Sequence, residues 1–480
     1  MFRRRHSRAS AVRRLKPGAL HRGSLKLPQA WLPGRSRKRT FRNLGRLFFP
    51  QARALGIQVD EDLSPTLIEK TVQLGTMLRS FPQARIASQS LLDVRLTTKR
   101  IERLTERIGQ ERVAERDAQV RTWQSLPLVE KLVAPPGVKP PDVVAVSCDG
   151  GRLQRCDLPA ERDSNWCEYK AGTLSQLKAV TQANDPCPEI PAVFLNPTRI
   201  DTLAREIGHV AAEPADLSVP PPQSAATAET ASAPVTSPRA SAPLPDEMAS
   251  ESVYVPPQVL SRDVCATLGD SHQFGHILAA VAWSLGFAAA RLKAFVADGL
   301  PWNWTIWDKH FKHLRFVPIL DFIHALTYVY AAALADRRHD QGWPIYTRWI
   351  RWIWEGQVLT VIAELAERQK ELGLPPDDAS ETDPRQIVSA ALTYLQNQQS
   401  RMNYPEYRKQ GLPITSSHME STIKQLNERI KGSEKFWCGR GGEAVLQLRA
   451  DMLSNSQPLS AFWAGRADAA TGTRTYDMAA

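Results

Sequence analysis

Short apolar runs that each lead into an aspartate constrain the fold of this chain most strongly. The runs are Val143–Val146, Ala294–Ala297 and Phe316–Leu320, and the acids that follow them are Asp149, Asp298 and Asp321. Continuous apolar runs of this length are typical of buried strands. Helical patterns at about 272–292 and 322–334 alternate with the later runs. Alternating buried strands and helices predict an α/β fold in which acids gather at strand ends.

Asp149 has two interpretations on the residues alone. Gly150 and Gly151 follow it, and an Asp-Gly pair is a common hairpin turn. The run continues to Leu153, and a second β-type run lies near 166–177, so we expect an antiparallel meander. The turn is the favoured interpretation, and an acid of a functional site is the alternative. For Asp321, the alternative to chemistry is an N-cap of the helix at 322–334.

The segment 411–437 predicts a helix that begins at Ser417, because Glu420 follows three residues later in a capping-box pattern. The apolar face of this helix is formed by Met419, Ile423, Leu426 and Ile430. Glu420, Lys424 and Lys431 lie along its edge, which suits a metal-bound carboxylate beside phosphate-binding lysines. A solvated outer face is an equal alternative.

The positive charge of the chain is concentrated near its N-terminus. The net charge is +11, and residues 1–50 contain fifteen Lys and Arg residues but no Asp or Glu, which leaves 46 basic and 50 acidic residues elsewhere. Such an arm is too polar to bury itself and suits the phosphates of DNA or RNA. A solvated tail without a function is the alternative.

Helices are predicted at about 64–79, at 81–92 and from Thr97 or Thr98 onward. In the third, Ile101, Leu104 and Ile108 share the inner face. The outline resembles a helix-turn-helix, with the third helix reading the major groove, although basic outer faces are also common on ordinary helices. The candidate DNA-binding residues of the chain are Lys99, Arg100, Arg103, Arg107, Lys424 and Lys431.

The six cysteines show no CxxC pair and no spacing with histidine that is typical of zinc sites. The apolar run at 277–290 is too short to span a bilayer, and the basic N-terminus is not followed by an apolar stretch of signal-peptide type. We therefore expect a reduced, cytoplasmic protein without disulfides and without a membrane partner.

The C-terminal third resembles the signature of the ISKra-type transposases of bacterial insertion sequences. The family pattern contains GLPIGSG, then ES, a lysine, an arginine, KGSG, a tryptophan and GAEAxLxLRA. This chain has GLPITSSHMES, Lys424, Arg429, KGSE, Trp437 and GGEAVLQLRA, with a Phe-Trp pair at 462–463. It departs from the pattern at Ser417 and Glu434, where the family has glycine.

This resemblance implies an α/β fold of the ribonuclease-H-like type, with a mixed sheet, a helical insertion and an all-α DNA-binding region ahead of it. It implies a DDE triad of Asp149, Asp298 and Glu420 that binds two Mg²⁺ ions, for which Mn²⁺ can substitute. Asp321 and His324 form a supporting pair, and Asp321 is the competing choice for the second metal ligand.

The activity that the resemblance implies is cleavage of DNA at the ends of an insertion sequence and strand transfer into target DNA. The partners are then double-stranded DNA, both terminal inverted repeats and target, and further copies of the chain in a homo-oligomer on DNA, in a bacterial cytoplasm at the nucleoid. The alternatives are a catalytically inactive DNA-binding protein derived from a transposase, and a ribonuclease-H-like nuclease without strand transfer.

The expected domain organisation combines these patterns with the composition of the linking segments. In chain order the parts are a disordered basic arm at 1–48, a helical DNA-binding domain at 49–134, the first part of the catalytic core at 135–213, a disordered Pro/Ala/Ser insertion at 214–250, the second part of the core at 251–335, a helical insertion at 336–403, the region of Glu420 at 404–465 and a disordered tail at 466–480. Tryptophans 343, 349, 352 and 354 in the helical insertion favour core packing, with contacts to an opened DNA end as the alternative.

Overall fold

The computed structural model describes residues 39–40, 46–58, 61–159, 164–208 and 254–475. Contacts divide the chain into two compact units, residues 1–105 with 458–480 and residues 106–457. The expected insertion at 214–250 and most of the expected arm at 1–48 lie outside the described residues. All of the candidate carboxylates belong to the larger unit.

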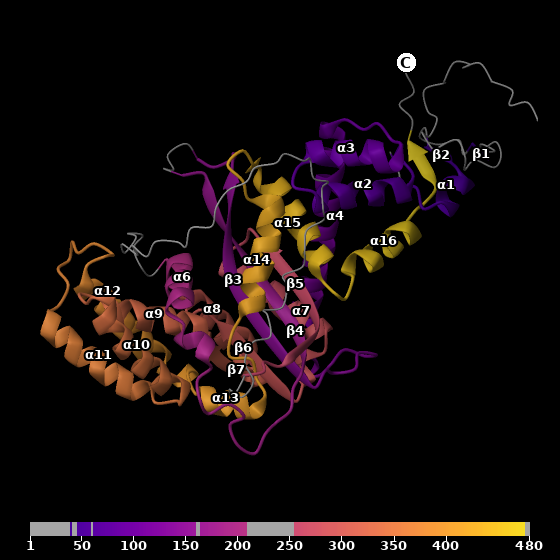
Figure 1. Ribbon diagram of the computed structural model, residues 1–480. Coiled ribbons are helices and arrows are strands. Elements are labelled where there is room, and N and C mark those ends of the chain that lie inside the picture. The colour runs from indigo at the N-terminus through magenta and orange to yellow at the C-terminus, as the bar shows by residue number, and fades with distance from the viewer. Residues whose placement is uncertain (1–38, 41–45, 59–60, 160–163, 209–253, 476–480) are drawn as a thin grey trace, which may run out of the picture. The chain divides into compact units, whose positions relative to one another are not determined.

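A mixed sheet forms the centre of the larger unit (Figure 1). Its main strands are β3 (Val143–Arg155), β4 (Trp166–Lys178), β5 (Gln258–Thr267), β6 (Leu292–Ala297) and β7 (Val317–Leu320), in the order β5-β4-β3-β6-β7. Strands β3, β4 and β5 pair antiparallel, whereas β6 runs parallel to both β3 and β7. The short strand β8 (Phe436–Trp437) pairs with the end of β3. The predicted α/β class and the predicted meander are confirmed.

Strand β3 does not end at Asp149, which corrects the expectation from the sequence. Asp149, Gly150 and Gly151 pair with Ala171, Lys170 and Tyr169 of β4, and β3 continues to Arg155. The hairpin interpretation is therefore wrong. The physical reason lies in the Tyr169 ring, because a Cβ at Gly151 would stand 2.1 Å from it. Glycine is required here for a close cross-strand approach and not for a turn.

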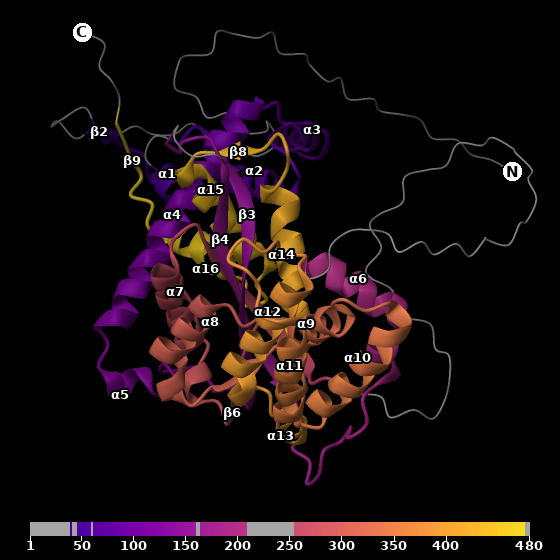
Figure 2. The same ribbon diagram turned by 90° about the vertical axis from the view of Figure 1, so that its left-hand side faces the viewer.

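Helices cover both faces of the sheet. Helix α7 (Ser271–Ser284) contacts β4 and β5, while α14 (Ser417–Ile430) contacts β3 and β4. The two helices lie on opposite sides of the sheet in Figure 2, and α15 (Gly439–Leu453) packs on β5. Helix α7 is shorter than the predicted 272–292, because Phe287–Ala289 forms a separate 3-10 turn that buries Phe287 in the core.

The region predicted to be helical at 336–403 contains α10 (His339–Trp354), α11 (Val358–Leu372) and α12 (Pro384–Gln398), which confirms that prediction. Helices α10 and α12 contact α9 (Phe322–Leu334). Trp349 and Trp354 are buried, and Trp343 and Trp352 are half-buried against the same core, so the packing interpretation of the tryptophans is confirmed. The remaining helices of the larger unit are α5 (Leu128–Lys131), α6 (Pro197–Ile207), α8 (Pro301–Ile306) and α13 (Tyr404–Gln410).

The smaller unit is mainly helical. It contains α1 (Pro50–Ala54), α2 (Pro65–Met77), α3 (Phe81–Leu92), the start of α4 (Thr98–Ser125) and α16 (Pro458–Asp468). The hydroxyl of Ser64 accepts a hydrogen bond from the Leu67 N–H at 3.3 Å, and Pro65 begins α2, as the sequence predicts. The inner face predicted for α4 is also confirmed, because Ile101, Leu104 and Ile108 are buried.

Three short strands of the smaller unit correct the expected disorder at both ends of the chain. These strands are β1 (Arg39–Thr40), β2 (Arg46–Phe48) and β9 (Thr473–Thr475), and β2 pairs antiparallel with both others. The expected tail at 466–480 is therefore wrong for 466–475, since α16 also reaches Asp468. Backbone pairing orders β9, and an ion pair between Arg466 and the buried Glu61 holds the end of α16.

One buried ion pair fastens α13 to the loop that follows β4. The side chain of Arg408 is fully buried, lies over the Trp354 ring at 4.0 Å and donates from Nε to Asp185 Oδ1 at 2.9 Å. Because a buried guanidinium without its partner is costly, we expect Asp185→Ala to lower the free energy of unfolding by about 3 kcal/mol. Urea unfolding followed by tryptophan fluorescence measures this change.

Asp308→Ala is the matched control, because Asp308 pairs with Lys312 at 2.6 Å but both side chains are more than half exposed. Its expected loss is below about 1 kcal/mol. Equal losses for the two variants would contradict a structural role for the buried pair.

Candidate active site

The parallel pairing of β3 with β6 brings two acids to adjacent positions. Cys148 lies opposite Ala297 in the register, and Asp149 and Asp298 are the next residue on each strand. Neighbouring strands lie about 4.8 Å apart, so the two acids emerge from neighbouring backbone positions. Their proximity in space was an expectation that the sheet topology bears out.

The two carboxylates are held differently. Asp149 Oδ1 accepts the N–H of Gly150 at 2.6 Å. Asp298 Oδ1 accepts the N–H of Leu300 at 3.0 Å and Nδ2 of Asn303 at 2.6 Å. Asn303 is fully buried, so it holds the Asp298 carboxylate from the protein interior. No sequence signal marked Asn303, because its contact depends on the path of the loop after β6.

The site carries uncompensated negative charge. Burial, followed by the negative charge of Asp298, raises the pKa of Asp149 to about 6, and Glu420 adds a smaller contribution. Burial also raises the pKa of Asp298. Interaction with His324 lowers the pKa of both acids, but by less than burial raises it. Asp149, Asp298, Glu420 and His324 therefore lie within electrostatic reach of one another.

Glu420 reaches the site from the first turn of α14, which packs against β3 and β4. The helix begins at Ser417, as predicted, but its N-cap is Ser416, where no side-chain cap bond is formed. The predicted capping box from Ser417 is therefore wrong. The start of the helix is held instead by Asp321, whose Oδ2 accepts the Ser416 N–H at 2.7 Å and also its hydroxyl.

Asp321 joins three segments of the chain and is almost fully buried. It follows β7 directly, its Oδ1 accepts the Ile323 N–H at 2.7 Å as the N-cap of α9, and its Oδ2 holds Ser416 before α14. Both carboxylate oxygens thus have protein donors. His324, one turn further along α9, lies in the groove beside Asp298. The geometry favours Asp298 over Asp321 as the acid available to a ligand.

The donor set has the chemistry of a site for a divalent cation. Mg²⁺ and Mn²⁺ prefer carboxylate oxygens, and a cation would favour the ionised form of acids whose pKa is raised mainly by burial. Among the described residues, no three His, Cys, Asp or Glu side chains form a group that could hold a metal ion as they stand. The fold therefore supplies the ligand types at one place, without a closed set of ligands.

The candidate DNA-binding residues have different surroundings. On α4, Lys99 pairs with Glu102 at 2.6 Å and Arg100 pairs with Asp62, while Arg103 and Arg107 are exposed. On α14, Lys424 and Lys431 are exposed, and the Lys431 ammonium lies 5.6 Å from the centre of the Trp166 ring.

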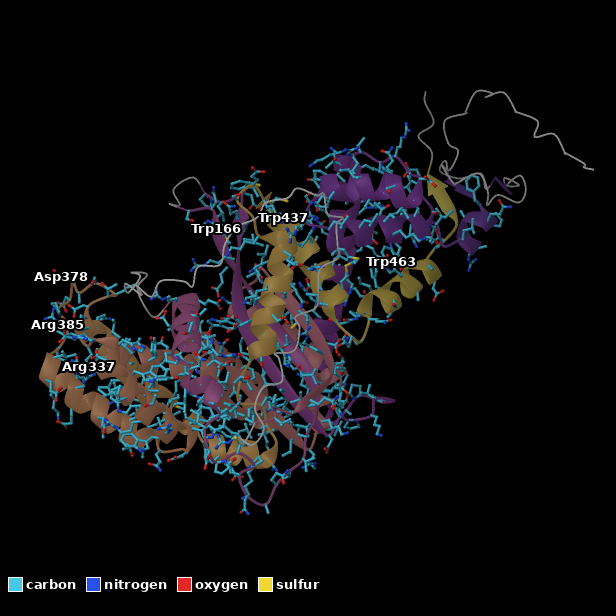
Figure 3. All side chains as sticks on the ribbon, viewed as in Figure 1. Trp166, Arg337, Asp378, Arg385, Trp437 and Trp463 are labelled. Carbon is cyan, nitrogen blue, oxygen red and sulfur yellow. The ribbon has the colours of Figure 1, made fainter. Side chains whose placement is uncertain are left out.

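The end of α14 is fixed by Trp437 of the C-terminal segment. Trp437 Nε1 donates to the Ile430 carbonyl at 2.9 Å, and the Arg429 guanidinium lies over its ring at 5.0 Å. Figure 3 shows Trp437 and Trp166 together near this end of the helix. Arg449 Nε also donates to the Gln425 carbonyl at 3.2 Å, so α15 supports the same helix.

Comparison with known proteins does not place the chain in a family. No protein-family model matches the sequence, and a search of curated proteins gives no match either. Within the part of the chain that the structure describes, none of the helices combines the length and the apolar character needed to cross a bilayer.

The buried charge of Asp149 predicts that replacing this residue with asparagine stabilises the fold in a pH-dependent way. Because the folded pKa of about 6 lies above the ordinary value of 3.8, the ionised carboxylate destabilises the fold at neutral pH. The cost is absent below about pH 4 and complete above about pH 6. We expect Asp149→Asn, measured by urea unfolding in EDTA, to raise the free energy of unfolding by about 2 kcal/mol at pH 8.

The gain should disappear near pH 4, where Asp149 is protonated in both the folded and unfolded states. Asp142→Asn is the control, because the Arg291 hydrogen bond lowers the pKa of this exposed acid. The control should show no gain at pH 8. A gain for Asp149→Asn that did not change with pH would contradict the electrostatic explanation.

Proposed function

We propose that this protein is a DNA transposase of the DDE type, which cleaves phosphodiester bonds at the ends of an insertion sequence and joins them to target DNA. One observation carries the proposal. Asp149 and Asp298 each follow directly after the last register pair of β3 with β6, Cys148 and Ala297, and Glu420 comes to them from a helix packed on β3. Clustered carboxylates at a sheet edge are the ligands that metal-dependent phosphoryl transfer requires.

The sheet order supports a ribonuclease-H-like core. Strands β3, β4 and β5 form the antiparallel meander, β6 returns parallel beside β3, and β7 follows it. Helices α10, α11 and α12 stand in the chain between β7 and the helix that carries Glu420. This order agrees with the arrangement that the resemblance to ISKra-type transposases implies, including the helical insertion before the final acid.

Asp149, Asp298 and Glu420 are the residues that would hold a pair of Mg²⁺ or Mn²⁺ ions. When bound, such ions activate a water or a 3′ hydroxyl and stabilise the charge on the leaving oxygen. Asn303 orients Asp298 by donating to its carboxylate. Asp321 acts through position, because it fixes the start of α14 and hence Glu420. His324 stabilises the ionised form of both aspartates, because its interaction with them lowers their pKa values.

Double-stranded DNA is the proposed partner, as terminal repeats and as target. The exposed lysines 424 and 431 follow Glu420 along α14, and cations in such positions bind phosphates. The exposed arginines 103 and 107 of α4 and the basic sequence at 1–50 are further candidates. Handling of two element ends calls for a homo-oligomer on the DNA.

Replacing any of the proposed metal-binding carboxylates should abolish transposition. In a transposition assay with a marked element, we expect Asp149→Ala, Asp298→Ala and Glu420→Ala to lose more than about 100-fold, since even outer partners of metal ligands are worth roughly 10- to 100-fold. Asp142→Ala, an exposed acid before β3, should keep activity.

Binding and folding are measured beside transposition for each variant. A folded parent that binds the element ends with Mg²⁺ but neither cleaves nor joins them would support the inactive DNA-binding alternative. Cleavage that needs no particular ends and is not followed by joining would support the nuclease alternative.

Asp321→Asn separates a positioning residue from a ligand. Asp321 accepts N–H groups on both oxygens, from Ile323 and from Ser416, whereas an asparagine has one acceptor oxygen and would turn its NH2 toward one of these donors, so we expect a loss of about 2 kcal/mol in the free energy of unfolding and a lower cleavage rate. The Mn²⁺ concentration needed for half-maximal cleavage should stay within about twofold of the parent, whereas it should rise about tenfold or more in Asp298→Asn. A large shift for Asp321→Asn would make Asp321 the ligand instead.

A further inference from the structure

A groove of about 780 Å³ opens directly beside Asp298. One wall is the loop that follows β6, another is α12, and His324 and Tyr328 of α9 complete the lining. The volume lies within the range of about 300–1,000 Å³ that is usual for sites of small organic groups. A ligand in this groove would therefore lie next to the proposed site of phosphodiester cleavage.

The wall formed by α12 is polar but uncharged. Gln386, Ser389, Thr393 and Asn397 recur at spacings of three and four residues and line the groove from one face of the helix. Their side chains have no hydrogen-bond partner in the part of the chain that the structure describes. Amides and hydroxyls of this kind pair with the donor and acceptor edges of nucleobases.

The groove is a poor match for a phosphate backbone. Arg401 is the only Lys or Arg among the described residues that line it, whereas grooves that follow a nucleic-acid backbone are rich in cations. The guanidinium of Arg401 lies over the Trp304 ring at 4.3 Å and donates to Gln398 Oε1 at 2.7 Å. Its charge is thus already engaged by protein groups.

Flat side chains line the same groove. The rings of Tyr328 and Tyr394 stack with their centres 3.8 Å apart and their planes at 17°. Trp304 is about nine-tenths buried, and its indole N–H is buried without a hydrogen-bond partner among the described residues. Tyr328 and Tyr394 are half-buried, so the pair offers a partly exposed aromatic surface against which a base can stack.

The groove and the acid form one rigid arrangement. The Tyr394 hydroxyl donates to the Asp298 carbonyl at 2.6 Å, and Gln398 Nε2 donates to the Gly299 carbonyl at 3.1 Å. Gly299 has a φ of +97°, and a Cβ there would stand 2.8 Å from the Tyr394 ring. Glycine is therefore required for α12 to approach the loop this closely.

We propose that this groove binds one unpaired nucleobase of the DNA strand that is cleaved beside Asp298. The inference rests on the proposed function and adds a feature of its substrate. The Watson–Crick edge and the faces of a base are hidden inside a duplex, so a base must leave the stack to offer them to the side chains of α12. The groove then holds the nucleotide next to the reacting phosphate by its base.

The test compares two short DNA duplexes of the same sequence, one with a single unpaired 2-aminopurine and one fully paired, in EDTA so that no cleavage occurs. We expect the full-length protein to bind the unpaired duplex about tenfold more tightly and to quench the 2-aminopurine by stacking. Ser389→Trp fills the groove and should bring the two affinities together. Gln396→Trp, exposed on the same helix but outside the groove, should keep the preference.

A second variant guards against misfolding of Ser389→Trp, which circular dichroism detects. Thr393→Ala combined with Asn397→Ala leaves the groove open and should reduce the preference about threefold or more. Equal affinities in the parent, or a preference that survives in both variants, would overturn the inference.

Cleavage and joining of element ends, which test the proposed function, are measured separately from the binding preference. Asp149→Asn should keep the binding preference, because binding requires no cleavage. If the parent cleaves and joins element ends with Mg²⁺ but shows no preference for the unpaired duplex, only the inference about the groove is wrong. A parent that binds neither duplex and cleaves no ends removes both proposals.

Discussion

The parallel pairing of β3 with β6 is the constraint on which the candidate site depends. It places Cys148 opposite Ala297, so the acids that follow on each strand come from neighbouring positions although 149 residues separate them in sequence. Backbone hydrogen bonds maintain this register, and a slip of one residue would send one acid to the other face of the sheet. Asn303 and the helix that carries Glu420 are then placed around these two positions.

The energetic consequence is a site that opposes its own folding. Burial raises the pKa of both Asp149 and Asp298, and the interaction with His324 lowers it by less. Asn303 and backbone N–H groups hold the carboxylates in place while leaving their charge uncompensated. Buried acids with raised pKa values are typical of functional sites, where stability is given up for activity.

Asp321 differs from Asp149 and Asp298 in that both of its carboxylate oxygens are already engaged by the protein. Its oxygens are occupied by the N–H groups at the starts of α9 and α14, so it works as a connector between β7 and both helices. Helix α12 makes a comparable connection through Tyr394 and Gln398 to the loop of Asp298. These connections join the helical insertion and the helix of Glu420 to the same sheet edge, where a groove and a set of carboxylates adjoin.

The sequence alone determined the element types, because apolar runs and helical periods reflect burial directly. The α/β class, the strands at β6 and β7, and the helices around Ser64 and Glu420 all follow from such local patterns. Tertiary structure decided that β3 runs through Asp149. The glycine at 151 serves the close approach of the Tyr169 ring on the neighbouring strand and not a turn. It also decided that Asp321 holds Ser416 before α14, that Asn303 holds Asp298 and that α12 lines a groove. Each of these depends on contacts between residues far apart in the chain, which no local pattern records.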